Sequence, residues 1–138
     1  MIGTPEQDAF IDRNKWAVAT TLRRDGSPTS SVVFFARDGE DLVFSTTRSR
    51  LKARTVARDS RIALCVLDEG APFGFLTVEG TATIQEDGIV PPHVAINRAM
   101  RGQPDWNPPE GYVERLAAEG RVIVRVRPRR VSGMVNRQ

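Results

Sequence analysis

Cysteine and histidine are almost absent from this chain of 138 residues, which has one of each, Cys65 and His93. A single cysteine excludes an internal disulfide, and these two side chains are too few ligands for an ordinary zinc site. Cys65 lies in the apolar run 62–67, where we expect a buried and inert thiol. His93 follows two prolines at an expected helix start, where an exposed histidine needs no function. We therefore expect no metal site and no catalytic side chain.

Long hydrophobic runs are also missing. The longest uncharged stretch, residues 26–36, is much shorter than the roughly 18 apolar residues of a membrane span. The first residues show no basic and then apolar signal segment, so we expect a cytoplasmic protein with no membrane partner. Lysine is scarce as well: arginine supplies 18 of the 20 basic residues, and only Lys15 and Lys52 are lysines. A lysine in this chain therefore needs its own explanation.

The charged residues leave a formal net charge of +3, and they are unevenly placed. Six basic residues fall within 48–61, opposed there only by Asp59. Such a run suits an anionic partner, either a phosphorylated small molecule or a nucleic acid. Hydrophobic residues at 40% and charged residues at 27% are typical of a folded globular protein, and the length predicts one domain over residues 1–138.

Short β-type segments separated by turns dominate the chain. Asp-Gly pairs at 25–26 and 38–39 are hairpin signals, and a capping box at Thr4 predicts a first short helix. The expected strands are 16–22, 30–35, 42–46, 61–67, 73–85 and 122–126, with helices at 49–58 and in two pieces within 91–120. This order predicts a mainly β fold of β+α type, a barrel of six to seven antiparallel strands with short peripheral helices. An oligonucleotide-binding barrel has the same strand pattern, so the site residues have to decide between them.

The segment 45–54 places hydroxyl groups, an expected helix start and several cations at a strand-to-helix junction. Backbone N–H groups at a helix N-terminus attract an anion, and Arg50 and Lys52 would add charge-assisted hydrogen bonds to it. These are the components of a phosphate site. A solvated basic helix with surface ion pairs is the alternative that composition alone leaves open.

Five motifs occur in one order along the chain. They are Gly-x-Pro at 26–28, the strand 30–35, Ser-Thr-Thr followed by Arg-x-Lys-x-Arg within 45–54, Val-Glu-Gly-Thr-Ala at 78–82, and the ending 124–133. With these motifs the chain resembles, from about residue 15 to 133, the pyridoxamine 5′-phosphate oxidase-like split β-barrel superfamily. Within it, the sequence is most similar to the group that uses the deazaflavin coenzyme F420, the deazaflavin-dependent oxidoreductase B group.

The resemblance implies a split β-barrel of the FMN-binding type that forms a homodimer, with two cofactor sites at the interface. Trp106 lies where relatives of this family carry a tryptophan. A structural role as a buried anchor of its loop would explain this residue equally well. The cofactor-binding residues that the resemblance implies are Ser31, Val32 and Val33 beside the ring, Ser45, Thr46, Thr47, Arg50, Leu51 and Lys52 around the phosphate, Arg54 along a basic path, and Phe73 and Phe75 in ring-stacking or substrate-facing positions.

The function implied by the resemblance is that of an F420H2-dependent reductase. The cofactor would carry out hydride transfer with an unidentified small organic substrate, while the protein holds the phosphate and excludes water. An FMN-binding oxidoreductase needs the same phosphate ligands, and a non-catalytic flavin- or deazaflavin-binding protein needs no turnover. A single-stranded nucleic-acid barrel needs exposed aromatic residues, but most of the six phenylalanines fall inside strand patterns, so we expect no nucleic-acid partner.

Overall fold

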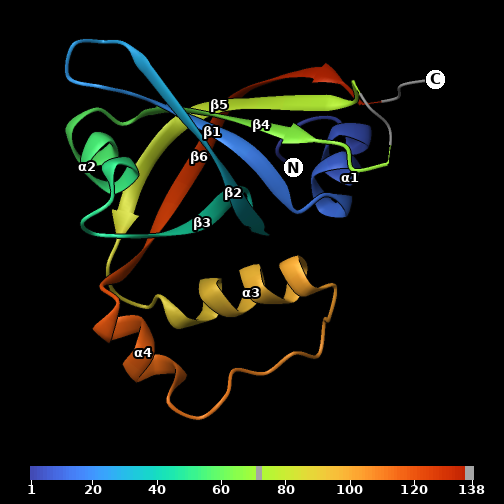
Figure 1. Cartoon of the computed structure of the whole chain (residues 1–138). Helices are drawn as coiled ribbons and strands as arrows, with labels where there is room; N and C mark the ends of the chain where they lie inside the picture. The colour runs from blue at the N-terminus through green and yellow to red at the C-terminus, as the bar shows by residue number, and fades with distance from the viewer. Residues whose placement is uncertain (71–72, 136–138) are drawn as a thin grey trace.

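The structure, a computed structural model, describes residues 1–70 and 73–135, and in these residues six antiparallel strands close into a barrel with four helices around it (Figure 1). The strands are β1 (Trp16–Leu22), β2 (Pro28–Asp38), β3 (Asp41–Thr47), β4 (Arg61–Leu67), β5 (Phe75–Gln85) and β6 (Arg121–Met134), in the order β1-β2-β3-β6-β5-β4 around the barrel. The helices are α1 (Pro5–Arg13), α2 (Leu51–Arg58), α3 (Val90–Arg101) and α4 (Tyr112–Ala118). The predicted barrel with peripheral helices is confirmed.

The barrel core follows from the alternation of side chains along each strand. In β4, Leu64 and Val66 point inward and are fully buried, whereas Cys65 between them is partly exposed. The expectation of a buried thiol was therefore wrong, because the period of two places Cys65 on the outer face of the strand. The largest fully buried side chains are Phe10, Phe35, Phe44, Ile11, Leu42, Leu64, Leu76, Ile123, Val43, Val66, Val78 and Val122.

The first hairpin forms at the Asp-Gly pair that the sequence indicates. Gly26 has a φ of 86°, a left-handed conformation that side chains rarely adopt. The carboxylate of Asp25 accepts hydrogen bonds from the backbone N–H of Ser27 at 3.0 Å and from its hydroxyl at 2.6 Å. This turn joins β1 to β2, and a second turn joins β2 to β3, so three consecutive strands form a meander.

Strand β6 continues well beyond its expected end at residue 126. Its second half pairs with β5 as far as the pair Phe75 and Met134, while most of its side chains there are exposed. Backbone hydrogen bonds to β5 hold this half of the strand. Because its side chains are not buried on one face, its sequence lacks the alternation of apolar and polar residues from which a strand is predicted. The pairing shifts between Glu79 and Gly80, which confirms the irregularity expected at Gly80, and a Cβ there would clash with the backbone of Arg127.

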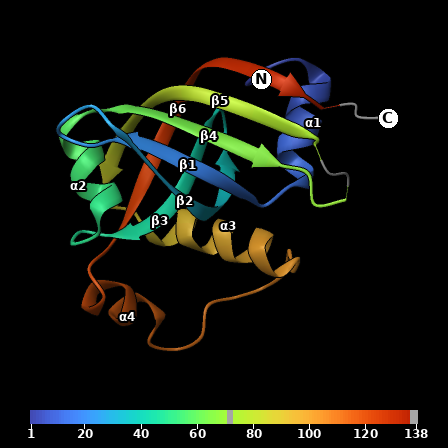
Figure 2. The ribbon, with the colours of Figure 1, turned by 45° about the horizontal axis from the view of Figure 1, so that its top comes forward.

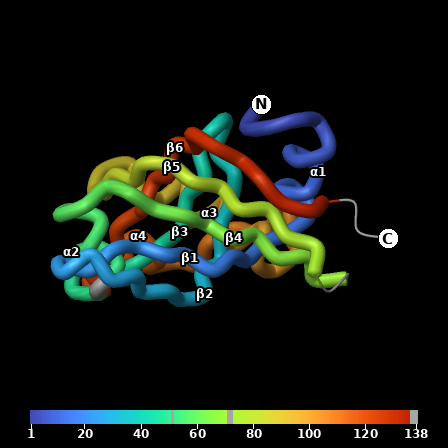
Figure 3. Tube along the Cα trace, turned by 90° about the horizontal axis from the view of Figure 1, so that it is seen from above, coloured from blue at the N-terminus to red at the C-terminus, as the bar shows by residue number. Residues whose placement is uncertain are grey.

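Helices α1 and α2 lie at opposite ends of the barrel when it is seen from above (Figure 3), and α3 and α4 form a layer on one side of it (Figures 1 and 2). Ile96 of α3 packs against Ala36, Val43 and Ile123, on the outer faces of β2, β3 and β6. None of the helices in the described ranges is long and apolar enough to span a membrane. The docking of α3 places its polar residues next to the outer faces of β2 and β3, where the site lies.

Candidate functional site

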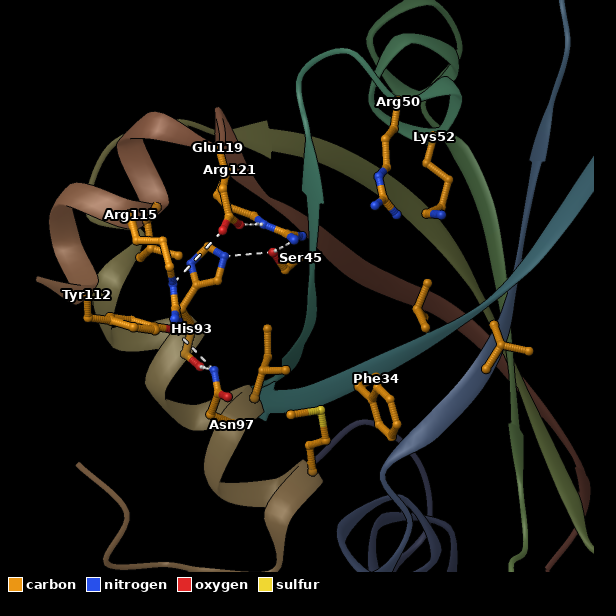
Figure 4. Close-up of a pocket in the computed structure, with 15 residues that line it drawn as sticks. Phe34, Ser45, Arg50, Lys52, His93, Asn97, Tyr112, Arg115, Glu119 and Arg121 are labelled. Carbon is orange, nitrogen blue, oxygen red and sulfur yellow. Dashed lines mark hydrogen bonds and ion pairs between the residues drawn. The ribbon is translucent and has the colours of Figure 1, made fainter. Parts of the chain in front are cut away.

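A cavity of about 460 Å³ lies between the barrel and the layer formed by α3 and α4 (Figure 4), within the usual size range of small-molecule pockets. Its barrel wall consists of Val32, Val33, Phe34, Ser45, Arg50 and Lys52. Its helix wall consists of His93, Ile96, Asn97 and Met100 from α3, Tyr112, Arg115, Leu116 and Glu119 from α4 and the turn after it, and Arg121 from β6. The two walls therefore come from distant parts of the chain.

The barrel wall contains two cations that the start of α2 brings together. Arg50 is the N-cap residue of α2, with extended backbone angles and no side-chain cap hydrogen bond, and Lys52 lies in the first turn. Figure 4 shows the two side chains side by side, pointing in the same direction into the cavity. Both also line a smaller neighbouring hollow of about 210 Å³ together with Thr29 and Ser31 of β2. A ligand anion in either space would meet both cations.

The electrostatics of this pair favour an anion. The pKa of Lys52 is lowered, first by the burial of its amino group and then by the positive charge of Arg50. Within residues 1–70 and 73–135, no carboxylate forms an ion pair with Arg50 or Lys52, whereas Arg48 nearby pairs with Glu86 at 2.9 Å. Two adjacent cations without a counter-charge repel each other, and a bound phosphate would relieve that repulsion.

The helix wall contains a histidine that joins it to the barrel wall. Nδ1 of His93 lies 2.6 Å from the carbonyl oxygen of Ile89, so Nδ1 carries the proton and donates it. Nε2 lies 2.7 Å from the hydroxyl oxygen of Ser45. Burial lowers the pKa of His93, which keeps the ring neutral, and the neutral Nε2 accepts a hydrogen bond from Ser45. The guanidinium of Arg121 donates a longer hydrogen bond, 3.5 Å, to the same hydroxyl oxygen.

The expectation of an unremarkable exposed histidine was wrong, since His93 is only 3% exposed and lines the cavity. Its partner Ser45 lies 48 residues away on β3, so the contact depends on how α3 docks on the barrel. A signal was nevertheless present in the sequence. His93, Ile96, Asn97 and Met100 follow the spacing of one helix face, and all four line the cavity. That periodicity would have placed His93 on the buried side of the helix.

The loop between α3 and α4 is fixed by stacked aromatic and arginine side chains. The rings of Trp106 and Tyr112 meet edge to face, with centroids 5.8 Å apart. Arg101 lies over the ring of Trp106 at 4.9 Å, and Arg115 lies over the ring of Tyr112 at 5.2 Å. Trp106 thus serves as a loop anchor, and it holds α4 where Tyr112 and Arg115 face the cavity.

Five of the predicted cofactor-binding residues line the cavity of about 460 Å³, namely Val32, Val33, Ser45, Arg50 and Lys52. Ser31 lines the smaller hollow beside it. Leu51 begins α2, and its side chain lies outside the described part of the structure.

The other predicted residues lie away from the cavity. Thr46 is buried on the same side of β3 as Phe44, facing the barrel interior, and Thr47 lies 3.4 Å from the hydroxyl of Ser49. Arg54 lines a separate hollow on α2. Strand β5 begins with Phe75, at the end of the barrel where β5 lies beside α1 (Figure 1), and Phe73 precedes Phe75 by two residues in the chain. Within one chain, these two phenylalanines therefore do not line the cavity that contains Arg50 and Lys52.

Comparison with protein families matches residues 4–134 to the pyridoxamine 5′-phosphate oxidase model. The chain belongs to this family. Among solved structures, it is similar to an F420 reductase, with 29% identity over 91% of this chain and 94% of the other and a TM-score of 0.72. A comparison with curated proteins found no match.

Two solved structures with lower sequence identity share the fold of this chain. A putative pyridoxamine 5′-phosphate oxidase from Listeria innocua is 19% identical, with a TM-score of 0.70 over 95% of this chain and 98% of the other. A FAD-binding protein from Mesorhizobium loti is also 19% identical, with a TM-score of 0.69 over 95% of this chain and 93% of the other. Proteins with this fold are thus named for different cofactors, so the site itself has to indicate which one this chain holds.

Proposed function

We propose that this protein is an F420H2-dependent reductase that binds the cofactor in the cavity between the barrel and α3, with the cofactor phosphate at Arg50 and Lys52. The observation that carries the proposal is the pair of adjacent cations with no carboxylate partner among the described residues, at the wall of a cavity of about 460 Å³. The similarity to an F420 reductase at 29% identity supports the same cofactor.

The residues of the chain bind and orient in this proposal, and the cofactor supplies the hydride. Val32 and Phe34 of β2 offer apolar side chains beside Arg50 and Lys52, on which one face of a planar ring would lie, while the side chain of Val33 between them packs in the barrel core. Apolar side chains on that wall also exclude water from the reacting face. The substrate is an unidentified small organic molecule that approaches from the helix wall.

The deazaflavin is favoured over FMN by further basic residues next to the phosphate pair. Arg23 and Arg24 of the first hairpin and Arg54 and Arg58 of α2 line a hollow of about 660 Å³, and within the described residues none of the four is ion-paired with a carboxylate. FMN ends at its phosphate, whereas the deazaflavin continues into a tail of several glutamates. A surface of unpaired arginines beyond the phosphate suits such a tail.

A second copy of the chain completes the site in our proposal. Apolar residues that are paired across neighbouring strands form a row on the outer face of the barrel. Trp16 of β1 pairs with Phe34 of β2, and Phe75 of β5 pairs with Leu67 of β4 on one side and with Met134 of β6 on the other. Trp16, Phe34, Leu67 and Met134 are 37, 41, 36 and 45% exposed. This row reaches the cavity at Phe34, so a homodimer that buries it would also close the cavity.

The proposal is tested by titrating the purified protein with F420 and with FMN and following the absorbance and fluorescence of each cofactor. We expect F420 to bind more tightly, and its affinity to fall as salt is added. The double variant Arg54→Ala, Arg58→Ala should weaken F420 binding by roughly twofold to thirtyfold, as two exposed charge contacts would, and leave FMN binding unchanged. Tight FMN binding without detectable F420 binding would instead identify an FMN-binding oxidoreductase. F420 binding without reduction of any substrate tested would identify a cofactor-binding protein.

A further inference from the structure

The helix wall of the cavity holds a second group of cations, across from Arg50 and Lys52 (Figure 4). Arg121 donates from Nε to the carboxylate of Glu119 at 2.9 Å, and Nε of Arg115 lies 3.9 Å from the other oxygen of the same carboxylate. The single negative charge of Glu119 is therefore shared between Arg115 and Arg121. The wall keeps an excess positive charge that the phosphate of the cofactor, bound at the opposite wall, would not neutralise.

The arginines retain the geometry to bind an anion. The side chain of Arg121 is 28% exposed and uses Nε for Glu119 and Nη1 for a long contact to Ser45, which leaves its Nη2 donors for a ligand. A partly buried guanidinium binds a carboxylate with two parallel hydrogen bonds, which are stronger than those formed in water. Arg121 thus offers an anion site at one end of the helix wall, and the more exposed Arg115, whose side chain is 58% exposed, lies beside it on the same carboxylate.

A hydroxyl donor lies beside the arginines. Tyr112 is buried, and its oxygen accepts a hydrogen bond of 3.1 Å from the side-chain amide of Asn97, which leaves the hydroxyl proton for an acceptor in the cavity. Burial raises the pKa of Tyr112, so the hydroxyl keeps its proton near neutral pH. The apolar side chains of the wall are Ile96, Met100 and Leu116.

We propose that the helix wall is the substrate subsite and that the substrate is a small organic acid, with its carboxylate at Arg115 and Arg121 and its apolar body on Ile96, Met100 and Leu116. This inference rests on the proposed reductase function and adds the class of substrate to it. The two walls then bind different molecules: the barrel wall binds the anionic cofactor, and the helix wall binds the anionic substrate. The proposed substrate has an apolar body beside a charged end because, within the helix wall, the positive charge lies at Arg115 and Arg121 and the apolar side chains are Ile96, Met100 and Leu116.

Binding of a model acid to the cofactor-free protein tests the proposal by calorimetry. The probes are trans-cinnamate and its neutral amide, cinnamamide, which share one apolar body and differ in charge. We expect cinnamate to bind at least about tenfold more tightly than cinnamamide, and Arg121→Gln and Arg115→Gln each to weaken cinnamate binding while leaving cinnamamide binding unchanged. Arg129→Gln is the matched control, since Arg129 is exposed on β6 outside the cavity, and it should have no effect.

Removing the competing acid should improve binding. In Glu119→Gln, both arginines lose their carboxylate partner, so cinnamate affinity should rise by about threefold to tenfold, the effect of one unit charge a few ångströms away in a partly hydrated site. A variant that merely disturbs the fold would not strengthen binding. Unchanged or weaker cinnamate binding in Glu119→Gln would overturn the proposal.

Two further results separate this inference from the proposed function. Equal loss of cinnamate binding in Lys52→Ala would place the acid at the phosphate pair and overturn the subsite. A loss of F420 affinity in Arg115→Gln as large as in Lys52→Ala would assign the arginines to the cofactor, with the same consequence. If F420 fails to bind but cinnamate binding depends on Arg115 and Arg121, the acid subsite stands and the proposed reductase function falls.

Discussion

The hydroxyl of Ser45 on β3 donates to Nε2 of His93 on α3 across 2.7 Å, and this bond joins the two walls of the cavity. While His93 is neutral, Ser45 has no proton left for a ligand and offers only its lone pairs. A bound phosphate needs donors, so its contacts must come from Arg50, Lys52 and the backbone at the start of α2. In the proposed function, Ser45 therefore positions His93 and the helix wall, and the cations at the start of α2 hold the phosphate.

Protein stability should depend on pH through His93, the only histidine in the chain. Burial holds the pKa of His93 below its ordinary value of 6.5. Below pH 6.5, the histidine therefore binds a proton in the unfolded chain but stays neutral in the folded protein. The free energy of unfolding should therefore fall as the pH decreases from 7 to about 5.5, with a slope of at most about 1.4 kcal/mol per pH unit. Urea denaturation at a series of pH values measures this slope.

The control for that slope is His93→Gln, which removes the titrating group. Its free energy of unfolding should be nearly constant over the same pH range, because carboxylates titrate mainly at lower pH. Equal slopes in the two proteins would show that another group causes the pH dependence.

Lys52→Ala should weaken cofactor binding by about 10- to 150-fold, the loss of one charge-assisted contact of about 1.5–3 kcal/mol. Lys52 lines the cavity from the first turn of α2 and has no carboxylate partner among the described residues, so the folded state loses little. The melting temperature of the cofactor-free variant should stay near that of the parent protein. Fluorescence titration with F420 gives the affinity.

Arg129→Ala provides the comparison, because it removes one positive charge from an exposed position far along β6. Its F420 affinity should match that of the parent protein. If both variants lose affinity equally, the cofactor responds to the overall charge, and no phosphate site exists at Lys52.

The barrel and the closeness of Arg50 to Lys52 could be predicted because both depend on residues close together in the sequence. The turn at Gly26 and the strand-to-helix junction that carries Arg50 and Lys52 are local features with strong signals. The helix wall could not be predicted in this way, because His93 meets Ser45 only after α3 docks on the barrel, and Arg121 reaches Ser45 only through the pairing of β3 with β6. Tertiary contacts of this kind leave no local pattern beyond the spacing of one helix face.

Gly80→Ala should destabilise the barrel by about 1–3 kcal/mol. The added Cβ would collide with the carbonyl of Arg127 on β6, at the point where the pairing of β5 and β6 shifts, and backbone cannot move aside as a flexible side chain can. Gly70→Ala is the control, since the nearest atom to its Cβ would be the Asp68 carboxylate oxygen at 3.6 Å, an ordinary contact. Urea denaturation should show a change within about 0.5 kcal/mol for Gly70→Ala, and equal losses would contradict the role given to the bulge.

Leu67→Glu should convert the proposed dimer into monomers. Leu67 lies in the apolar row on the outer face of the barrel, paired with Phe75, and does not line the cavity. A carboxylate in the middle of a buried apolar interface loses its water without gaining a partner, at a cost of several kcal/mol. The parent protein should sediment at twice the chain mass of 15.3 kDa, and the variant at that mass itself.

Val113→Glu is the matched control for the dimer prediction, because Val113 is an apolar residue of α4 that is 56% exposed and lies outside the apolar row. Sedimentation of Val113→Glu should be unchanged. If the cavity is completed by the second copy, Leu67→Glu should also weaken F420 binding even though Leu67 does not touch the cavity, whereas Val113→Glu should not. A parent protein that sediments as a monomer at micromolar concentration, or a monomeric variant that binds F420 with full affinity, would show that one chain holds the cofactor alone.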